Sequence, residues 1–229
     1  MKQRMIFTSV LCAILCVFSM PVTAGAVGAE DETPRVMIAE ISPESNQAAS
    51  EEHVRLYNPS SKPVDITGWR LQYRSASNAP TSEKGWSDKA ILGCSAAAET
   101  DCLTEDLKST KIDAGELVEL TSYGTDSDML PLESGMATAG GQLRLVYSQI
   151  DNVGVTVVVV MDLVGYGTAK TYEGTAAAIA PKAGRSIVRA EDLGAYVDTN
   201  DNGKDFVLSA ALENEDDTAT EAPGQGAGE

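Results

Sequence analysis

Residues 52–74, EHVRLYNPSSKPVDITGWRLQYR, constrain the fold more than any other stretch of this chain. Val54 and Leu56 alternate with polar or longer residues, which is the period of two that directs side chains to opposite faces of a β-strand. The following segment contains two prolines, which lack the N–H groups that a sheet ladder requires. A second alternating run begins at Trp69. The stretch therefore predicts a strand, a turn and a second strand, with the Trp69 indole in the core.

Other segments have the alternation or the unbroken apolar character of strands, and no segment has a helical period longer than about two turns. These strand segments are residues 35–41, 116–121, 142–147 and 154–163. The last of them, GVTVVVVMDL, is apolar on both faces, which predicts a central strand that is covered from both sides. Since strands dominate and long helices are lacking, the chain is expected to be all-β.

The first 24 residues have the organisation of a secretory signal peptide. Two basic residues precede an uncharged apolar run over residues 5–20, which is shorter than the roughly 20 residues of a membrane-spanning helix. Small residues then allow cleavage after residue 24, 26 or 29. We therefore expect a secreted protein without a transmembrane segment after cleavage, beginning with a flexible leader over residues 25–33.

Acidic residues outnumber basic ones by 34 to 17, so that the formal net charge is −17. A surface of this charge repels phosphate backbones and anionic lipids, and nucleic acid is therefore not an expected partner. Residues 212–229 contain no basic residue and end in a glycine-rich run. This composition predicts a disordered acidic tail.

Cys94 and Cys102 are the two cysteines that follow the signal peptide. An even number of cysteines in an exported chain predicts a disulfide bond, here one that closes a short loop. The alternative is a two-cysteine metal site, which would require further ligands. The only histidine, His53, lies far away in the sequence, so a structural disulfide is expected.

The second half of the chain carries a series of short motifs that occur together in one family. They are DLVGYG at 162–167, EG at 173–174, a proline at 181, SIVR at 186–189, DTNDN at 198–202 and DF at 205–206. Together with the strand–turn–strand pattern at 52–74, they resemble the secreted bacterial type of lamin tail domain. The resemblance extends over residues 34–211 and implies an immunoglobulin-like β-sandwich. It also implies a non-enzymatic module used for adhesion or targeting.

One segment has the spacing of a metal-binding loop. Asp198, Asn200 and Asn202 place oxygen atoms at alternate positions before a glycine, as in the first half of an EF-hand calcium loop. The bidentate Glu of such a loop is missing, since Ser209 stands at its position, and Asp205 could substitute from nearby. The alternative is an Asx-rich turn whose side chains bond their own backbone. Calcium and the structural turn both remain open at this point.

The sequence contains no set of residues that is typical of catalysis. His53 is the only candidate base and has no Gly-x-Ser-x-Gly motif near it. A hydrolase based on a pair of carboxylates remains as an alternative function, because acidic residues are numerous. We expect instead an interaction module for a cell-surface or extracellular protein or polysaccharide, with calcium-dependent binding as a second alternative. Trp86, in the long insertion over residues 75–110, is the candidate binding residue.

Overall fold

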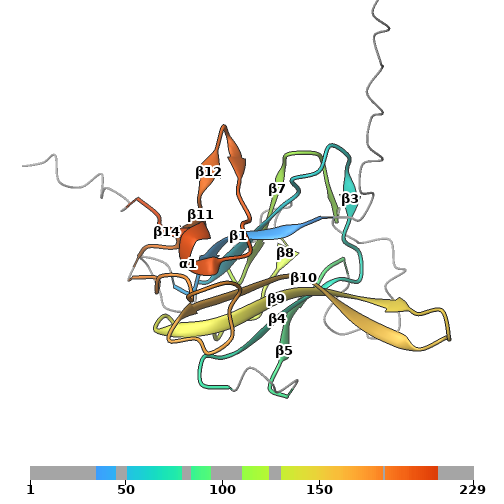
Figure 1. Ribbon diagram of the computed structural model, residues 1–229, viewed down its shortest axis with the longest axis horizontal. Helices are drawn as coiled ribbons and strands as arrows, with labels where there is room; N and C mark the ends of the chain where they lie inside the picture. Colours follow the sequence, from blue (N-terminus) through green and yellow to red (C-terminus); the bar gives the residue numbers. More distant parts are fainter. Residues whose placement is uncertain are drawn as a thin grey trace, which may run out of the picture. The chain divides into compact units, whose positions relative to one another are not determined.

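Two β-sheets face each other in the computed structural model of this protein (Figure 1). The structure describes residues 35–44, 51–78, 84–93, 110–123, 130–182 and 184–210. All of them belong to one unit, Pro34–Glu229. The predicted signal peptide, leader and acidic tail lie outside the described residues, and these boundaries remain predictions.

The larger sheet has six strands, in the spatial order β14-β11-β1-β2-β7-β8. Neighbouring strands are antiparallel, except for the parallel pair β7 and β8. In that order, the strands span Phe206–Leu208, Ile187–Arg189, Met37–Ser42, His53–Tyr57, Leu117–Thr121 and Leu130–Pro131. The predicted strand around Val54 and Leu56 is therefore β2, at the centre of this sheet.

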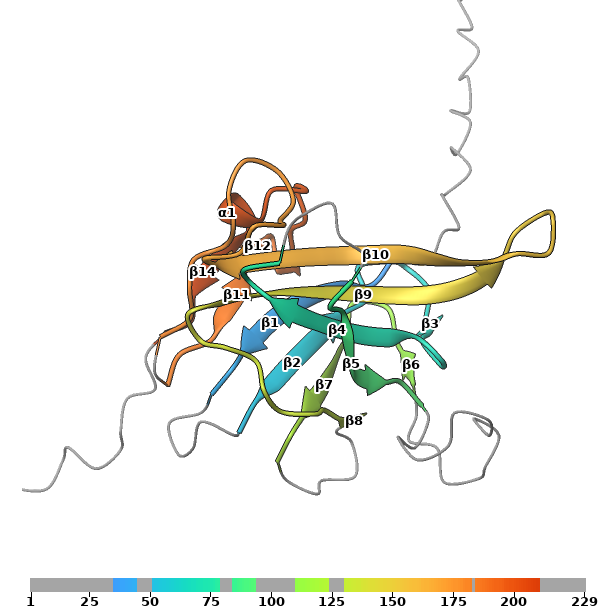
Figure 2. The ribbon, with the colours of Figure 1, turned by 90° about the horizontal axis from the view of Figure 1, so that it is seen from below.

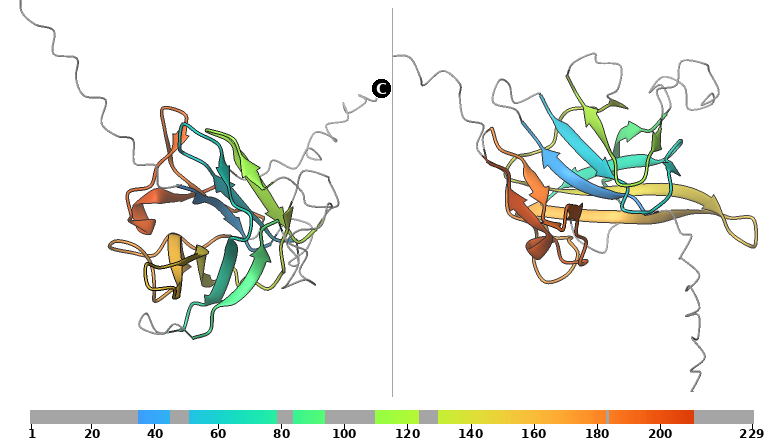
Figure 3. Two further views of the ribbon diagram at one scale, coloured as in Figure 1. Left: turned by 90° about the vertical axis from the view of Figure 1, so that its right-hand side faces the viewer. Right: turned by 90° about the horizontal axis from the view of Figure 1, so that it is seen from above.

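The smaller sheet has four antiparallel strands, in the spatial order β10-β9-β4-β5. They span Thr156–Gly167, Gly140–Ile150, Arg70–Ser75 and Ser87–Ile91. The end-on view in Figure 3, left, shows this sheet and the six-stranded sheet as two layers.

The hydrophobic core fills the space between the two sheets. Val54 and Leu56 of β2 contact it from one side, and Leu143 and Leu145 of β9 contact it from the other. Trp69 is also part of the core, as predicted, and its indole stacks on the Tyr147 ring with 5.2 Å between the centroids. Alternate residues of facing strands thus make one buried layer, which is the arrangement of a β-sandwich.

The prediction for residues 154–163 is wrong in one respect. These residues begin β10, but β10 is an edge strand of the four-stranded sheet rather than a central one. Its first half is open to solvent, and Val158 and Val160 are 57% and 46% exposed. The strand that is buried along its whole length is β1, because the Tyr196 ring covers the face of β1 that points away from the main core.

The remaining elements are short. They are the pair β12 (Glu191–Asp192) and β13 (Ala195–Tyr196), the pair β3 (Val64–Asp65) and β6 (Lys111–Ile112), and the single helical turn α1 (Asn202–Asp205). Within the part of the chain that the structure describes, no helix is long and apolar enough to span a membrane.

Candidate functional site

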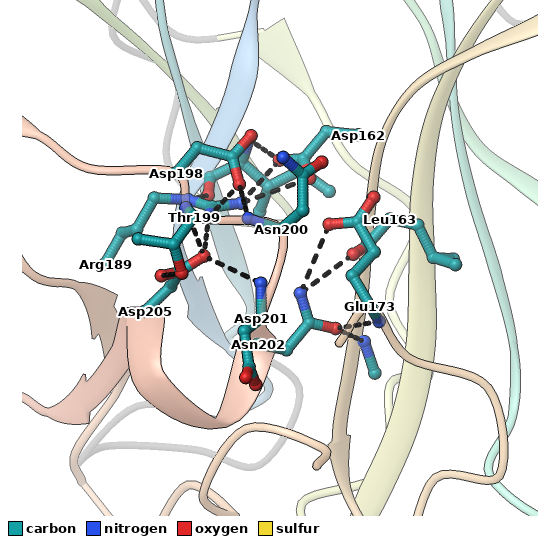
Figure 4. A network of polar contacts seen from close by, with 12 residues as sticks. Asp162, Leu163, Glu173, Arg189, Asp198, Thr199, Asn200, Asp201, Asn202 and Asp205 are labelled. Atoms are coloured by element: carbon teal, nitrogen blue, oxygen red, sulfur yellow. Dashed lines mark hydrogen bonds and ion pairs between the residues drawn. The ribbon is translucent and has the colours of Figure 1, made fainter. Parts of the chain in front are cut away.

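The predicted calcium segment surrounds a buried arginine (Figure 4). Arg189, at the end of β11, has a fully buried side chain and forms ion pairs with three carboxylates. Its guanidinium donates to both carboxylate oxygens of Asp162, at 2.9 and 3.1 Å, and to Asp198 and Asp205, each at 3.1 Å. It also donates to the Ile38 carbonyl at 3.0 Å. The cluster therefore joins β1, β10, β11 and the segment around α1.

The same segment has the hydrogen bonds of an Asx-rich turn. The Asn200 N–H donates to the Asp198 carboxylate, and the Thr199 N–H donates to the Asp205 carboxylate, both at 3.0 Å. Asn200 adopts a φ of 54°, in the left-handed region that Asn tolerates better than most residues. Oxygens of Asp198 and Asp205, two of the four candidate calcium ligands, are therefore engaged by backbone N–H groups and by Arg189.

Asn202, the third candidate ligand, is fully buried and points toward β10. Its side-chain oxygen accepts from the N–H groups of Gly165 and Glu173 at 2.9 and 3.0 Å, and its amide donates to the Leu163 carbonyl at 3.1 Å. Asn202 thus satisfies backbone groups at the outer edge of β10, which would otherwise be buried without partners.

Within the described ranges, no group of three or more His, Cys, Asp or Glu side chains is arranged to hold a metal ion. A cation bound between Asp198 and Asp205 would also lie beside the Arg189 guanidinium, whose positive charge opposes it. Calcium binding at Asp198, Asn200, Asn202 and Asp205 remains a prediction.

Glu173 lies on the outer side of this cluster and has an unusual acidity. Burial and the nearby carboxylates of Asp162 and Asp198 raise the pKa of the Glu173 carboxyl to about 7, although Arg189 and the Asn202 amide act in the opposite direction. Burial and the two neighbouring carboxylates thus outweigh the Arg189 guanidinium, and the Glu173 carboxyl is partly protonated near neutral pH.

A second polar array covers the outer face of the four-stranded sheet, the face turned away from the core. The Gln72 side chain lies at its centre, donating to Asp88 at 2.7 Å and accepting from Arg144 at 2.8 Å. Arg70 pairs with Asp88 at 2.5 Å. These residues share one face because strand pairing sets Gln72 opposite both Arg144 and Asp88.

Trp86 lies on this same face. Its ring is close to two guanidinium groups, with the Arg74 and Arg144 Cζ atoms 4.4 and 4.2 Å from the ring centroid. Arg74 is buried beneath it and donates to the Gln142 side chain at 2.9 Å. Trp86 is itself half-buried. The indole is therefore held in place by cation–π contacts on a face that carries three arginines.

His53 lies on the outer face of the six-stranded sheet and is not placed for nucleophilic catalysis. Its Nε2 is 3.3 Å from a Glu40 carboxylate oxygen, and the Ser186 hydroxyl donates to that same oxygen at 2.5 Å. The carboxylate lies between the hydroxyl and the imidazole, whereas a catalytic triad requires the imidazole between them. This arrangement does not equip Ser186 as a nucleophile.

Some predicted site residues are not described by the structure, and some residues of the observed site were not predicted. Cys94 and Cys102 lie outside the described residues, so their disulfide remains a prediction. The three arginines on the outer face were not predicted from the sequence, although a signal for two of them is present. Arg70, Gln72 and Arg74 alternate with core residues, and this period of two places them together on the face opposite the core.

Two facing sheets, a core of alternating residues and nearly exclusive use of strands define an immunoglobulin-like β-sandwich. Residues 29–220 match the family model of the lamin tail domain, and the chain therefore belongs to the lamin tail domain family. This finding confirms the resemblance and the fold class that the sequence predicts. Lamin tail domains are non-enzymatic modules. A search of curated proteins found no match.

Proposed function

We propose that this protein is an exported, non-enzymatic interaction module that binds a cell-surface or extracellular protein through the outer face of its four-stranded sheet. The observation that carries the proposal is the position of Trp86 over Arg74 and Arg144. Tryptophan and arginine are the residue types that contribute most to binding when they are held rigidly at the centre of an interface. Here both types are rigidly held on one face.

Local charge supports the same face. Arg70 and Arg144 are partly exposed on it, above the buried Arg74, and the hydrogen-bonded array contains one described carboxylate, that of Asp88. The chain as a whole has a net charge of −17. A cationic, aromatic surface on a strongly acidic protein favours a partner with exposed carboxylates, since guanidinium groups bind carboxylates through paired hydrogen bonds.

The test is capture of partners from culture medium and cell-wall fractions of the producing organism by immobilised Pro34–Glu229, the unit that contains the whole described core. Replacing Trp86 by Ala should weaken capture at least about tenfold, because it removes the aromatic centre of the face. Tyr123→Ala is the matched control. Tyr123 is an exposed aromatic residue just after β7, in the other sheet, and its loss should leave capture unchanged.

Two additional arms separate the alternatives. Protease treatment of the fractions should abolish capture if the partner is a protein, whereas persistence would identify a polysaccharide. A chelator should have no effect, and loss of capture with chelator would identify a calcium-dependent binder. Capture that survives Trp86→Ala would contradict the proposed face.

A further inference from the structure

The first half of β10 presents an unused sheet edge. Within the described part of the chain, β9 is the only strand that pairs with β10, and the β9–β10 hairpin projects beyond the other strands (Figure 2). Val155, Val158 and Val160 are 55%, 57% and 46% exposed. An edge strand normally carries a charge, a proline or a bulge that prevents further pairing. Residues 153–160 contain no charged residue and no proline, and the register is regular as far as Val160.

The direction of the free backbone groups follows from the register. The Asp151 N–H donates to the Val155 carbonyl across the hairpin, so the polar backbone groups of Val155 point toward β9. In an antiparallel pair, this direction alternates from residue to residue. The N–H and C=O groups of Thr156, Val158 and Val160 therefore point away from β9, toward the open edge.

The second half of the same edge is already covered by the chain itself. Asn202 bonds the Leu163 carbonyl and the Gly165 N–H, and Ala178 bonds backbone groups of Gly165 and Gly167. The outward residues are thus even-numbered before the irregularity at Met161 and odd-numbered after it, as a one-residue bulge requires. Within the described residues, the edge of β10 therefore has a strand-like partner only from Leu163 onward.

A second copy of the same stretch satisfies this edge. When two copies run antiparallel about a twofold axis at Val158, Val158 faces its own equivalent and Thr156 faces Val160. Every outward N–H and C=O of one copy then meets a complementary group of the other. The side chains form Val–Val and Thr–Val pairs, which are favourable across strands. No like charges meet along the strand, although the chain carries a net charge of −17.

We propose that the protein forms a twofold symmetric dimer in which the Thr156–Val160 edges of two β10 strands pair and join the two four-stranded sheets into one. This inference does not depend on the Trp86 face. It concerns a different part of the sheet, and the dimer would carry two such faces. Symmetric pairing of identical surfaces is the commonest route to a closed oligomer.

Sedimentation velocity of Pro34–Glu229 tests the proposal. Wild type should show a reversible monomer–dimer equilibrium at about 100 µM, because an interface of this small size is expected to be weak. Val158→Lys should be monomeric, since it places two ammonium groups opposite each other at the axis. Val207→Lys is the matched control, because Val207 is a similarly exposed valine on β14, the edge strand of the other sheet, and this variant should still dimerise. A monomeric wild type, or a Val158→Lys variant that still dimerises, would overturn the proposal.

Cross-linking tests the register. Twofold pairing brings the two Val158 Cα atoms to about 5.5 Å, within disulfide range, so Val158→Cys should give a covalent dimer on oxidation. Val159→Cys should not, because Val159 faces Val157 of the other copy. Both variants are compared with wild type, which controls for Cys94 and Cys102. Equal cross-linking of the two variants would rule out this register.

Discussion

At the scale of single residues, Asn58 shows how one side chain holds the turn after β2. It is fully buried, and its amide donates to the carbonyls of Lys62, Ile112 and Asp113 at 2.8, 3.0 and 3.2 Å. Its side-chain oxygen accepts from the Ser60 N–H at 3.0 Å. Asn58 thus connects its own turn to the segment around β6, which is distant in sequence.

Asn58→Asp should lower the free energy of unfolding by about 3 kcal/mol, because three carbonyls, that of Ile112 in a buried position, lose their donor and face a negative charge instead. Chemical denaturation measures the change. The control is Asn152→Asp, the same substitution in the exposed β9–β10 turn, which should remain close to wild type. Equal stability of the two variants would show that the Asn58 bonds contribute nothing.

At the scale of elements, the Arg189 cluster fastens the last part of the chain to the sandwich. Arg189 lies on β11. Of its three carboxylate partners, Asp205 is the last residue of α1, Asp198 precedes α1, and Asp162 lies on β10. Its guanidinium also lies 4.7 Å from the Phe206 ring centroid at the start of β14. The short elements β11, α1 and β14 contribute little core individually, so this cluster is central to their docking.

Arg189→Met should destabilise the fold by about 3–5 kcal/mol, since removing one partner of a buried ion pair leaves uncompensated charge. The same denaturation assay applies, with hydrogen exchange of β11 and β14 as a local measure. Lys182→Met removes an exposed cation of similar length and should have little effect. Retention of full stability by Arg189→Met would refute the assigned role.

At the scale of the whole molecule, the crowding of carboxylates makes stability depend on pH. Glu173 has a pKa of about 7 in the folded protein, against an ordinary value of 4.5. The folded state therefore binds the proton more tightly than the unfolded state does. This contribution to stability is fully present below about pH 4.5, and it is lost as the pH rises through about 7.

Glu173→Gln, which mimics the protonated form, should raise the free energy of unfolding at pH 8 by about 1 kcal/mol, a value reduced from the full shift because the group is partly exposed. At pH 4 the variant and wild type should agree. Thermal unfolding across this pH range measures the difference. A difference that is independent of pH would show that the titrating group lies elsewhere.

The strands could be predicted largely from local patterns, whereas the site depends on contacts between distant segments. Alternation around Val54 and Leu56 and the apolar position of Trp69 are properties of short stretches, and the structure confirms both. The DTNDN segment showed only that oxygen atoms are closely spaced. The local sequence around Arg189 does not predict its ion pair with Asp162, because this pairing depends on how β10 and β11 pack.

The sequence by itself determined that this chain is all-β, because side-chain direction along a strand alternates whatever the strand's neighbours are, and its short motifs resembled those of the lamin tail domain. Only the tertiary structure decided which strands are central and which lie at an edge. The apolar run in β10 has the composition of a buried strand, yet one of its edges is open. Strand order follows from pairing between distant segments, and composition alone does not encode that order.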